Sequence, residues 1–532
     1  MVNRRDLICG TLATAASVAL PGCRLREISG RLLTSPASLG HRLLDGPGGI
    51  PPVSVRRTAR AVIAGGGIAG LAAARALKQQ GIRDVVVLDV LDAPGGNSSY
   101  GTNSVSAYPW GAHYVPLVRK DCMPVLDLFR DLKIIVDEDV QGRPVYDEYC
   151  LSADPQERLW MYGRWQEGLV PTIGATARDR ADFSRFFAEI ERLKNLLGTD
   201  GKPVFAIPVD SSSADPAWRA LDTLSIEQYL RQRGYQSQRL YWYINYCCRD
   251  DYGSTATAIS AWAGLHYFAS RNGVAANADA STVVTWPEGN GHLARELALG
   301  SGAEQVVEAL VTHVGRSGDG VAVRFFDSRS QRTVQIDASA AVVCLPRFVA
   351  CRVVEGLDPG GAAEFSYAPW MVANLTLSRM PEGRGQQLAW DNVIYDSPLL
   401  GYVVATHQSL AQNRRNTVIT YYWPLSGDDP AQERRRALSR SLSEWQTTVV
   451  GDLLRVHPEL DEHIENVDVR VWGHGMIRPT PGFIWGEARR SAVVNQPPVY
   501  FAHSDLSGVS IFEEAYCRGF EAGRLAARRV AA

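Results

Sequence analysis

Residues 59–89 read ARAVIAGGGIAGLAAARALKQQGIRDVVVLD, and this stretch decides the fold. The apolar run at 59–64 predicts a buried parallel strand. A glycine-rich turn follows at 65–70, and the small residues at 71–80 predict a helix that ends at Gly81. The run at 84–89 predicts a second strand. Strand, turn, helix and strand within about 30 residues predict a Rossmann-like dinucleotide-binding unit, so the predicted fold class is α/β.

Each glycine of the turn has its own expected role. Gly65 permits the tight turn, Gly67 lacks the Cβ that would block a pyrophosphate, and Gly70 permits close packing of the helix on the sheet. The start of the helix presents unpaired N–H groups to phosphate. Asp89, 24 residues past Gly65, can accept a hydrogen bond from an adenosine ribose. The cofactor-binding residues predicted in this unit are Gly65, Gly67, Ile68, Ala69, Gly70 and Asp89. The unit by itself does not distinguish NAD from FAD.

The composition excludes several classes of protein. The chain has 532 residues, of which 45% are hydrophobic and 21% charged, as in packed globular proteins of several domains. Lys+Arg is 55 and Asp+Glu is 57, so no basic field indicates a nucleic-acid partner. The nine cysteines form no CxxC pair, so no metal site is predicted, and most are interpreted as buried small hydrophobes.

The N-terminus predicts export. Arg4 and Arg5 precede a weakly apolar run at 7–20 and resemble a Tat signal at 1–22, used for proteins exported in folded form. The alternative is a chance arginine pair before an ordinary apolar region. LPGC at 20–23 resembles a lipoprotein cleavage box, so the expected location is periplasmic, with membrane contact only through a lipid on Cys23. Residues 23–57 are predicted to be a tether with little structure.

Later segments resemble the flavin-containing amine oxidase and phytoene desaturase superfamily. Gly95 and Gly96 match its Gly-Gly pair, although Ala93 and Asn97 stand where family members carry arginines. Further matches follow in the family's order at 110–113 (WGAH), 286–293 (WPEGNGHL), 310–314, 341–346 (AVVCLP), 501–505 (FAHSD) and the helix 513–527. The resemblance implies FAD as the cofactor. It adds Gly95, Gly96, Asn97, Gly111, Ala112, His113, Val311, Asp505 and Ile511 to the expected cofactor-binding residues.

The resemblance also divides the chain into domains. It implies a discontinuous FAD-binding domain at 58–115, 281–350 and 471–532. The insertions at 116–280 and 351–470 are expected to form an α+β substrate-binding domain. An amphipathic helix is predicted across 183–197, a capping box at Ser225 and Gln228, and a long helix across 438–456.

The implied activity is oxidation of a small organic substrate by hydride transfer to flavin N5, with an amine such as a polyamine as the first expectation. Two departures speak against a standard oxidase. Ala373 aligns with a lysine that holds a water near N5, and Ile511 takes the place of a cage tyrosine. The electron acceptor is therefore open between O2, a quinone and a cytochrome.

The predicted catalytic residues are His113, His474, His503 and Trp423. An imidazole beside the flavin could shuttle a proton, and the alternative for each is a structural histidine. Trp423 comes from a set of aromatic residues expected to contribute to a dry cavity. Arg249, Asp250 and Asp251 are interpreted as solvated charge, with a buried ion pair as the alternative. Two other functions stay open: an isoprenoid or carotenoid desaturase or isomerase that uses FAD, and a non-catalytic binder of the Rab escort and GDP dissociation inhibitor type.

Overall fold

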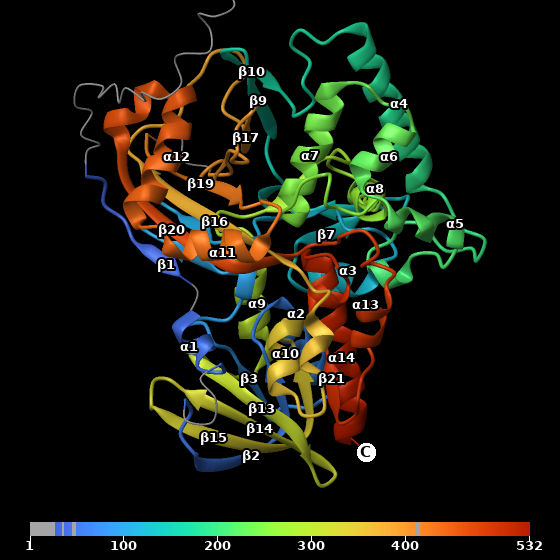
Figure 1. Cartoon of the computed structure of the whole chain (residues 1–532), viewed down its shortest axis with the longest axis vertical. Coiled ribbons are helices and arrows are strands. Elements are labelled where there is room, and N and C mark those ends of the chain that lie inside the picture. The colour runs from blue at the N-terminus through green and yellow to red at the C-terminus, as the bar shows by residue number, and fades with distance from the viewer. Residues whose placement is uncertain (1–26, 35–36, 45–48, 410–414, 532) are drawn as a thin grey trace, which may run out of the picture.

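The computed structural model describes residues 27–34, 37–44, 49–409 and 415–531 (Figure 1). The predicted signal at 1–22 and the predicted lipid attachment at Cys23 lie outside these residues. Within the described part of the chain, no helix is long and apolar enough to cross a membrane.

A seven-stranded sheet forms the lower half of the molecule (Figure 1). The strand order is β12-β3-β2-β15-β14-β13, and β21 also pairs with β15. The strands are β2 (Val53–Ala64), β3 (Val85–Leu88), β12 (Glu304–Val306), β13 (Ala309–Ser317), β14 (Gly320–Asp327), β15 (Arg332–Val343) and β21 (Val499–Phe501). The strands β12, β3, β2, β15 and β21 pair in parallel, whereas β13, β14 and β15 form an antiparallel meander. The parallel part confirms the Rossmann-like α/β prediction.

Two helices pack closely against each other beside this sheet. Helix α2 (Ile68–Gln79) follows the glycine turn, and α14 (Phe512–Ala531), red in Figure 1, runs down along the sheet to the C-terminus. A Cβ at Gly519 would lie 1.9 Å from the Ala69 carbonyl oxygen, and one at Gly523 would lie 2.5 Å from that of Ala73. The two helices can approach this closely only because α14 has glycine at both positions.

Substitution of Gly519 by valine is therefore expected to destabilise the protein. The side chain would overlap the α2 backbone, which cannot move without shifting the glycine turn, so the free energy of unfolding should fall by about 3 kcal/mol. Denaturant unfolding would measure the change. Gly300→Val is the matched control, since nothing lies within 4 Å of a Cβ there, and an equal loss in both variants would contradict the packing argument.

An eight-stranded sheet forms the upper half. Its order is β1-β20-β16-β19-β18-β17-β9-β10. The strands are β1 (Leu32–Thr34), β9 (Glu157–Met161), β10 (Arg164–Glu167), β16 (Tyr367–Leu377), β17 (Asp391–Ile394), β18 (Tyr402–Val404), β19 (Thr417–Pro424) and β20 (Ile464–Ile477). The whole of β20 belongs to this sheet, so the predicted domain boundary at 470/471 cuts through a strand and moves past Ile477.

The tether predicted at 23–57 is wrong for its described residues. Leu32 to Thr34 pair in parallel with Val469 to Val471, and β2 already begins at Val53. The prolines and glycines of this region pointed to a linker, but the residues between them supply backbone groups to both sheets. Pairing with a partner more than 400 residues away leaves no local signal in the sequence.

Helices of the first insertion cover one side of the upper half (Figure 1). They are α4 (Ala177–Lys194), α5 (Pro216–Arg219), α6 (Ile226–Gln232), α7 (Gln238–Tyr252) and α8 (Ala261–Ala269). Helix α4 confirms the predicted amphipathic helix, and Ser225 and Gln228 form the predicted capping box of α6. The predicted helix across 438–456 is instead two helices, α11 (Pro430–Ser439) and α12 (Leu442–Val456), because Ser441 and Glu444 form a second capping box.

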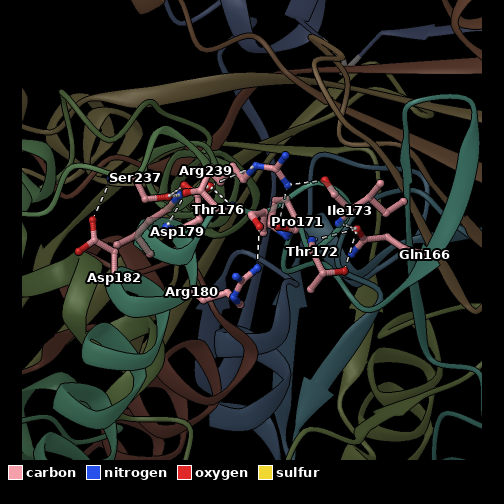
Figure 2. Close-up of polar contacts among 12 residues, drawn as sticks. Gln166, Pro171, Thr172, Ile173, Thr176, Asp179, Arg180, Asp182, Ser237 and Arg239 are labelled. Carbon is pink, nitrogen blue, oxygen red and sulfur yellow. Dashed lines mark hydrogen bonds and ion pairs between the residues drawn. The ribbon is translucent and has the colours of Figure 1, made fainter.

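A polar network joins the starts of α4 and α7 (Figure 2). Asp179 accepts hydrogen bonds from the Thr176 backbone N–H (2.9 Å) and from the Ser237 hydroxyl (2.6 Å). Asp182 accepts from the Ser237 N–H at 2.8 Å. Arg239 donates to the carbonyl groups of Pro171 and Ile173, in the loop before α4. These bonds fix α7 in place, and the C-terminal end of α7 reaches the site described below.

The remaining elements are short or connect the two halves. The helices are α1 (Ala37–His41), α3 (Met123–Asp131), α9 (Gly291–Ser301), α10 (Arg347–Val353) and α13 (Glu487–Ala492). Three small ribbons pair β4 (Tyr100–Thr102) with β5 (Ala107–Pro109), β6 (Tyr114–Pro116) with β11 (Val283–Thr285), and β7 (Ile135–Glu138) with β8 (Pro144–Tyr146).

Candidate functional site

The glycine turn has the geometry that its sequence predicts. Gly65 has a φ of +104°, and a Cβ there would lie 2.5 Å from the Cys344 carbonyl oxygen. A Cβ at Gly70 would lie 1.9 Å from the Gly65 carbonyl oxygen. A Cβ at Gly67, in contrast, would enter open space, since no atom lies within 4 Å of it. The first two glycines are required by the protein itself, whereas Gly67 borders a space that something else can fill.

This space lies at the start of α2. Gly67 is the N-cap residue and has no side chain to accept from the first N–H groups of the helix, which begin at Ile68 and Ala69. Unpaired N–H groups beside open space are suited to an anionic group such as a pyrophosphate. The residues present therefore fit the phosphate part of a dinucleotide.

Asp89 organises the same turn from the end of β3. Its carboxylate accepts from the N–H of Gly66 (2.7 Å) and from that of Leu91 (2.8 Å). Burial raises the pKa of this carboxyl to about 6. Each carboxylate oxygen keeps a second lone pair, so Asp89 can hold the turn and still accept from a ribose hydroxyl.

The Gly-Gly pair connects the turn to the second half of the molecule. Gly95 has a φ of +132° and donates its N–H to the Gly66 carbonyl at 2.9 Å. The Asn97 side-chain amide donates to the Gly475 carbonyl on β20. A Cβ at Gly111 would lie 2.3 Å from the Asn97 carbonyl oxygen, so Gly111 must be a glycine for this segment to pass.

A cavity of about 820 Å³ opens beside this junction. It brings together five of the predicted cofactor-binding residues, namely Asn97, Gly111, Ala112, His113 and Ile511. An apolar wall faces them, made mainly by Trp370, Val372, Tyr422, Trp472 and Met476. The cavity therefore joins the predicted ring-binding segment to an aromatic surface.

His113 is the predicted catalytic histidine that lines the cavity. Its ring stacks on Tyr422 with 4.5 Å between ring centroids, and the Tyr422 hydroxyl donates to the Gly111 carbonyl at 3.1 Å. Burial lowers the pKa of His113 to about 4. At neutral pH the imidazole is therefore uncharged, which suits packing against a ring better than carrying a proton in catalysis.

Other predicted residues lie outside the cavity lining. Asp505 is fully buried, and its carboxylate accepts from the Arg347 N–H (2.7 Å) and the Tyr367 hydroxyl (2.6 Å). His503 Nδ1 lies 3.0 Å from the same carboxylate. The His474 ring stacks on Phe348 at 4.2 Å. Val311 is buried in β13, within the core of the lower sheet.

Trp423 is wrong as a catalytic prediction. Its ring packs on Trp445 of α12 at 5.6 Å, on the face of β19 that points away from the cavity, whereas its neighbour Tyr422 lines the cavity. Successive residues of a strand point to opposite faces of the sheet. An assignment that is wrong by one position therefore selects Trp423 in place of Tyr422. The same alternation affects the alignment of Ala373. Ala373 lies in the core behind the sheet, whereas its neighbour Val372 faces the cavity.

Three carboxylates that line the same cavity change the interpretation of the acidic pair. Asp250 and Asp251 end α7, and Glu513 begins α14. Asp251 is ion-paired with Arg271. Asp250 is half-buried, and the positive charges of Arg271 and Arg249 act to lower its pKa, whereas Glu513 Oε2 is buried without a hydrogen-bond partner. For Asp251, which is 7% exposed, the prediction of solvated charge is wrong and the alternative of a buried ion pair is confirmed; Asp250 is half-buried and lines the cavity because the fold turns this end of α7 inward.

Sequence reasoning missed Glu513 altogether. It was assigned only to the closing helix, yet 4% of its surface is exposed. Burial raises the pKa of Glu513 to about 7, and burial with the neighbouring Asp251 raises that of Asp250 to about 7. The one available signal was the position of Glu513 directly after Ile511 and Phe512, two apolar residues that face the same cavity.

The raised pKa of Glu513 predicts a pH-dependent cost in stability. Below about pH 4.5, the ordinary value, the carboxyl is protonated in the folded and unfolded states and contributes nothing. Between pH 4.5 and 7 the unfolded state loses this proton first, so stability falls, by about 3 kcal/mol once pH exceeds 7. Glu513→Gln should therefore unfold at higher denaturant concentration than the wild type at pH 8, with a much smaller gain at pH 5. An equal gain at both pH values would contradict the burial argument.

The comparisons with known proteins agree with this architecture. Residues 63–132 match a family described as an NAD(P)-binding Rossmann-like domain. A solved structure of a putrescine oxidase triple mutant covers 89% of this chain and 100% of its own, with a TM-score of 0.66 and 17% identity. The chain has the amine oxidase fold.

Two further structures share the amine oxidase fold with this chain. The cyclohexylamine oxidase of Brevibacterium oxydans IH-35A covers 89% of this chain and 99% of its own, with a TM-score of 0.60 and 15% identity. A fatty acid isomerase of P. acnes that produces CLA covers 87% and 97%, with a TM-score of 0.61 and 16% identity. No curated protein is significantly similar in sequence. The amine oxidase fold thus includes proteins that are not amine oxidases, and the site must decide between them.

Proposed function

We propose that this protein is an FAD-dependent oxidoreductase that oxidises an amine. The observation that carries the proposal is a single cavity lined both by the predicted ring-binding segment at 111–113 and by two carboxylates, Asp250 and Glu513, of which Glu513 Oε2 is buried without a hydrogen-bond partner. A buried carboxylate without a partner is costly, and a cationic ligand would offset that cost. The amine oxidases of the same fold add support.

The acidic and aromatic side chains of the cavity together suit a substrate with two amino groups. When bound, FAD supplies a hydride acceptor at N5. The aromatic wall of Trp370, Tyr422 and Trp472 excludes water around the reacting end and, by desolvation, favours the neutral form of an amine there. Asp250 and Glu513 would hold a second group that stays protonated. We therefore favour a diamine or polyamine over a simple monoamine.

The electron acceptor and the location follow from the sequence. None of the five lysines of the chain lines the cavity, so no lysine holds a water in it. We propose that electrons pass to a quinone or a cytochrome, with O2 as the alternative. We further propose export as a folded, cofactor-loaded protein through the signal at 1–22, with a lipid on Cys23.

Purification followed by an anaerobic reduction screen tests the function. The wild-type protein should be yellow with flavin near one per chain, and a diamine should bleach its absorbance faster than the monoamine of the same length. Bleaching by polyenes and not by amines would instead indicate the desaturase or isomerase. A colourless protein after gentle isolation from its native host would indicate a binder without redox chemistry.

A further inference from the structure

Two cysteines far apart in the sequence meet beside the cavity. The Sγ atoms of Cys122 and Cys517 are 3.6 Å apart, although 395 residues separate them. Cys122 is 1% exposed and Cys517 is 8% exposed. Among the seven described cysteines, this is the one pair for which a sulfur–sulfur contact is found.

The two thiols have different surroundings. Cys122 is the N-cap residue of α3, beside the guanidinium-bearing Arg119, and both line a smaller cavity of about 230 Å³. Cys122 thus borders a space that a small molecule can enter, whereas Cys517 lines neither cavity. Cys517 lies inside α14, where its contact with Cys122 and its burial raise the pKa of its thiol well above the ordinary value. Cys122 is therefore the thiol that a small oxidant in the cavity meets first.

The smaller cavity, which Cys122 lines, adjoins the 820 Å³ cavity. It shares Pro116, Arg271 and Glu513 with the 820 Å³ cavity, so the same side chains form the wall between them. A thiol that is 1% exposed is closed to bulky disulfides, but the smaller cavity that Cys122 lines has room for an oxidant of about the size of water. Hydrogen peroxide is such an oxidant.

We propose that Cys122 and Cys517 are a peroxide-reactive pair that closes to a disulfide between α3 and α14. The Cys122 thiolate attacks one oxygen of hydrogen peroxide, the O–O bond breaks, and the hydroxide released takes a proton to become water. The Cys517 thiol then attacks the sulfur of the resulting sulfenic acid, its proton and the S–OH hydroxyl leave as a second water, and the S–S bond forms. Two thiols are oxidised by two electrons while one peroxide is reduced to two waters.

The disulfide needs only a small movement. An S–S bond is about 2.05 Å long, so each sulfur must shift by about 0.8 Å from the observed contact. The bond would fix the second turn of α14, one turn after Glu513. The cross-link would therefore stabilise the wall that carries the unpaired carboxylate.

Peptide mapping of the purified wild-type protein tests the proposal without using substrate or flavin turnover. After a tenfold excess of hydrogen peroxide, blocking of free thiols and digestion without reductant, one cross-linked peptide containing 122 and 517 is expected. Dithiothreitol should release it, and Tm should rise by several degrees in the oxidised protein. A sulfinic acid at either cysteine with no cross-link, or a different cysteine pair, would overturn the proposal.

Single substitutions test the order of the two steps. Cys517→Ala should leave a sulfenic acid on Cys122 that dimedone traps, whereas Cys122→Ala should give no dimedone adduct at Cys517. Cys351→Ala is the control and should leave the cross-link unchanged, because Cys351 lies in α10, away from both cavities. Dimedone trapping at Cys517 in place of Cys122 would refute the assigned roles. Because the mapping reads only thiols, its outcome is independent of whether the protein oxidises amines.

Discussion

The Gly67→Val variant is expected to fold normally and to retain no flavin. No protein atom lies within 4 Å of a Cβ at this position, and φ is −70°, so valine fits the folded chain without strain. Its branched side chain would, however, fill the open space at the start of α2, where a pyrophosphate would receive the first N–H groups of the helix. The flavin-to-protein ratio, read from absorbance, should fall from near one to near zero.

A matched substitution separates this effect from a general loss of stability. Gly451→Val, on α12, also places valine where nothing lies within 4 Å, and it should keep the wild-type flavin content. Far-UV circular dichroism should be the same for both variants. Full flavin content in Gly67→Val would refute the placement of the dinucleotide at this turn.

A second large effect, on the rate of flavin reduction, is expected when Asp250 or Glu513 loses its charge. Asp250→Asn and Glu513→Gln should each slow anaerobic flavin reduction by a diamine at least about 30-fold at low substrate concentration, because each removes a charge that faces a buried ammonium. Reduction by the monoamine of equal length should change much less. The difference between the two substrates separates recognition of the second amino group from damage to the reacting end.

Control and pH data sharpen this test. Glu521→Gln removes a charge from the exposed side of α14 and should leave both rates unchanged. Because the pKa values of Asp250 and Glu513 are both about 7, diamine affinity should increase from pH 6 to pH 8 as the carboxyls ionise. Equal effects of the cavity variants on diamine and monoamine would contradict the proposed diamine site.

The parts of the protein that could be predicted from sequence are those that local chemistry decides. The turn at 65–70 and Asp89 lie within one βαβ unit, and each residue type there answers a steric or hydrogen-bonding need close by in the chain. The capping box of α6 is local in the same way. Asn97, Gly111 and His113 were expected near one another from the resemblance, and the structure brings them to one cavity.

The site residues that were wrong or missed depend on burial and on which face of a strand a side chain occupies. Distant parts of the chain determine both. Tyr422 and Trp423 are equally aromatic, and only the direction of β19 selects which one faces the cavity. An aspartate is the same letter in the sequence at the surface or beside a cavity, so composition could not show that α7 ends at the cavity. Glu513 was missed for the same reason, and the pairing of β1 with β20 depends on residues more than 400 positions away.

The close contact between α14 and α2 has a consequence for protein engineering. Glu513 and Gly519 are six residues apart on α14, about 9 Å along its axis, so this one helix contacts both the cavity and the backbone of α2. Randomising the first residues of α14 to alter substrate preference is therefore expected to shift the helix and to weaken cofactor binding. Variants selected for new specificity should therefore be checked for flavin content by absorbance before their turnover is measured.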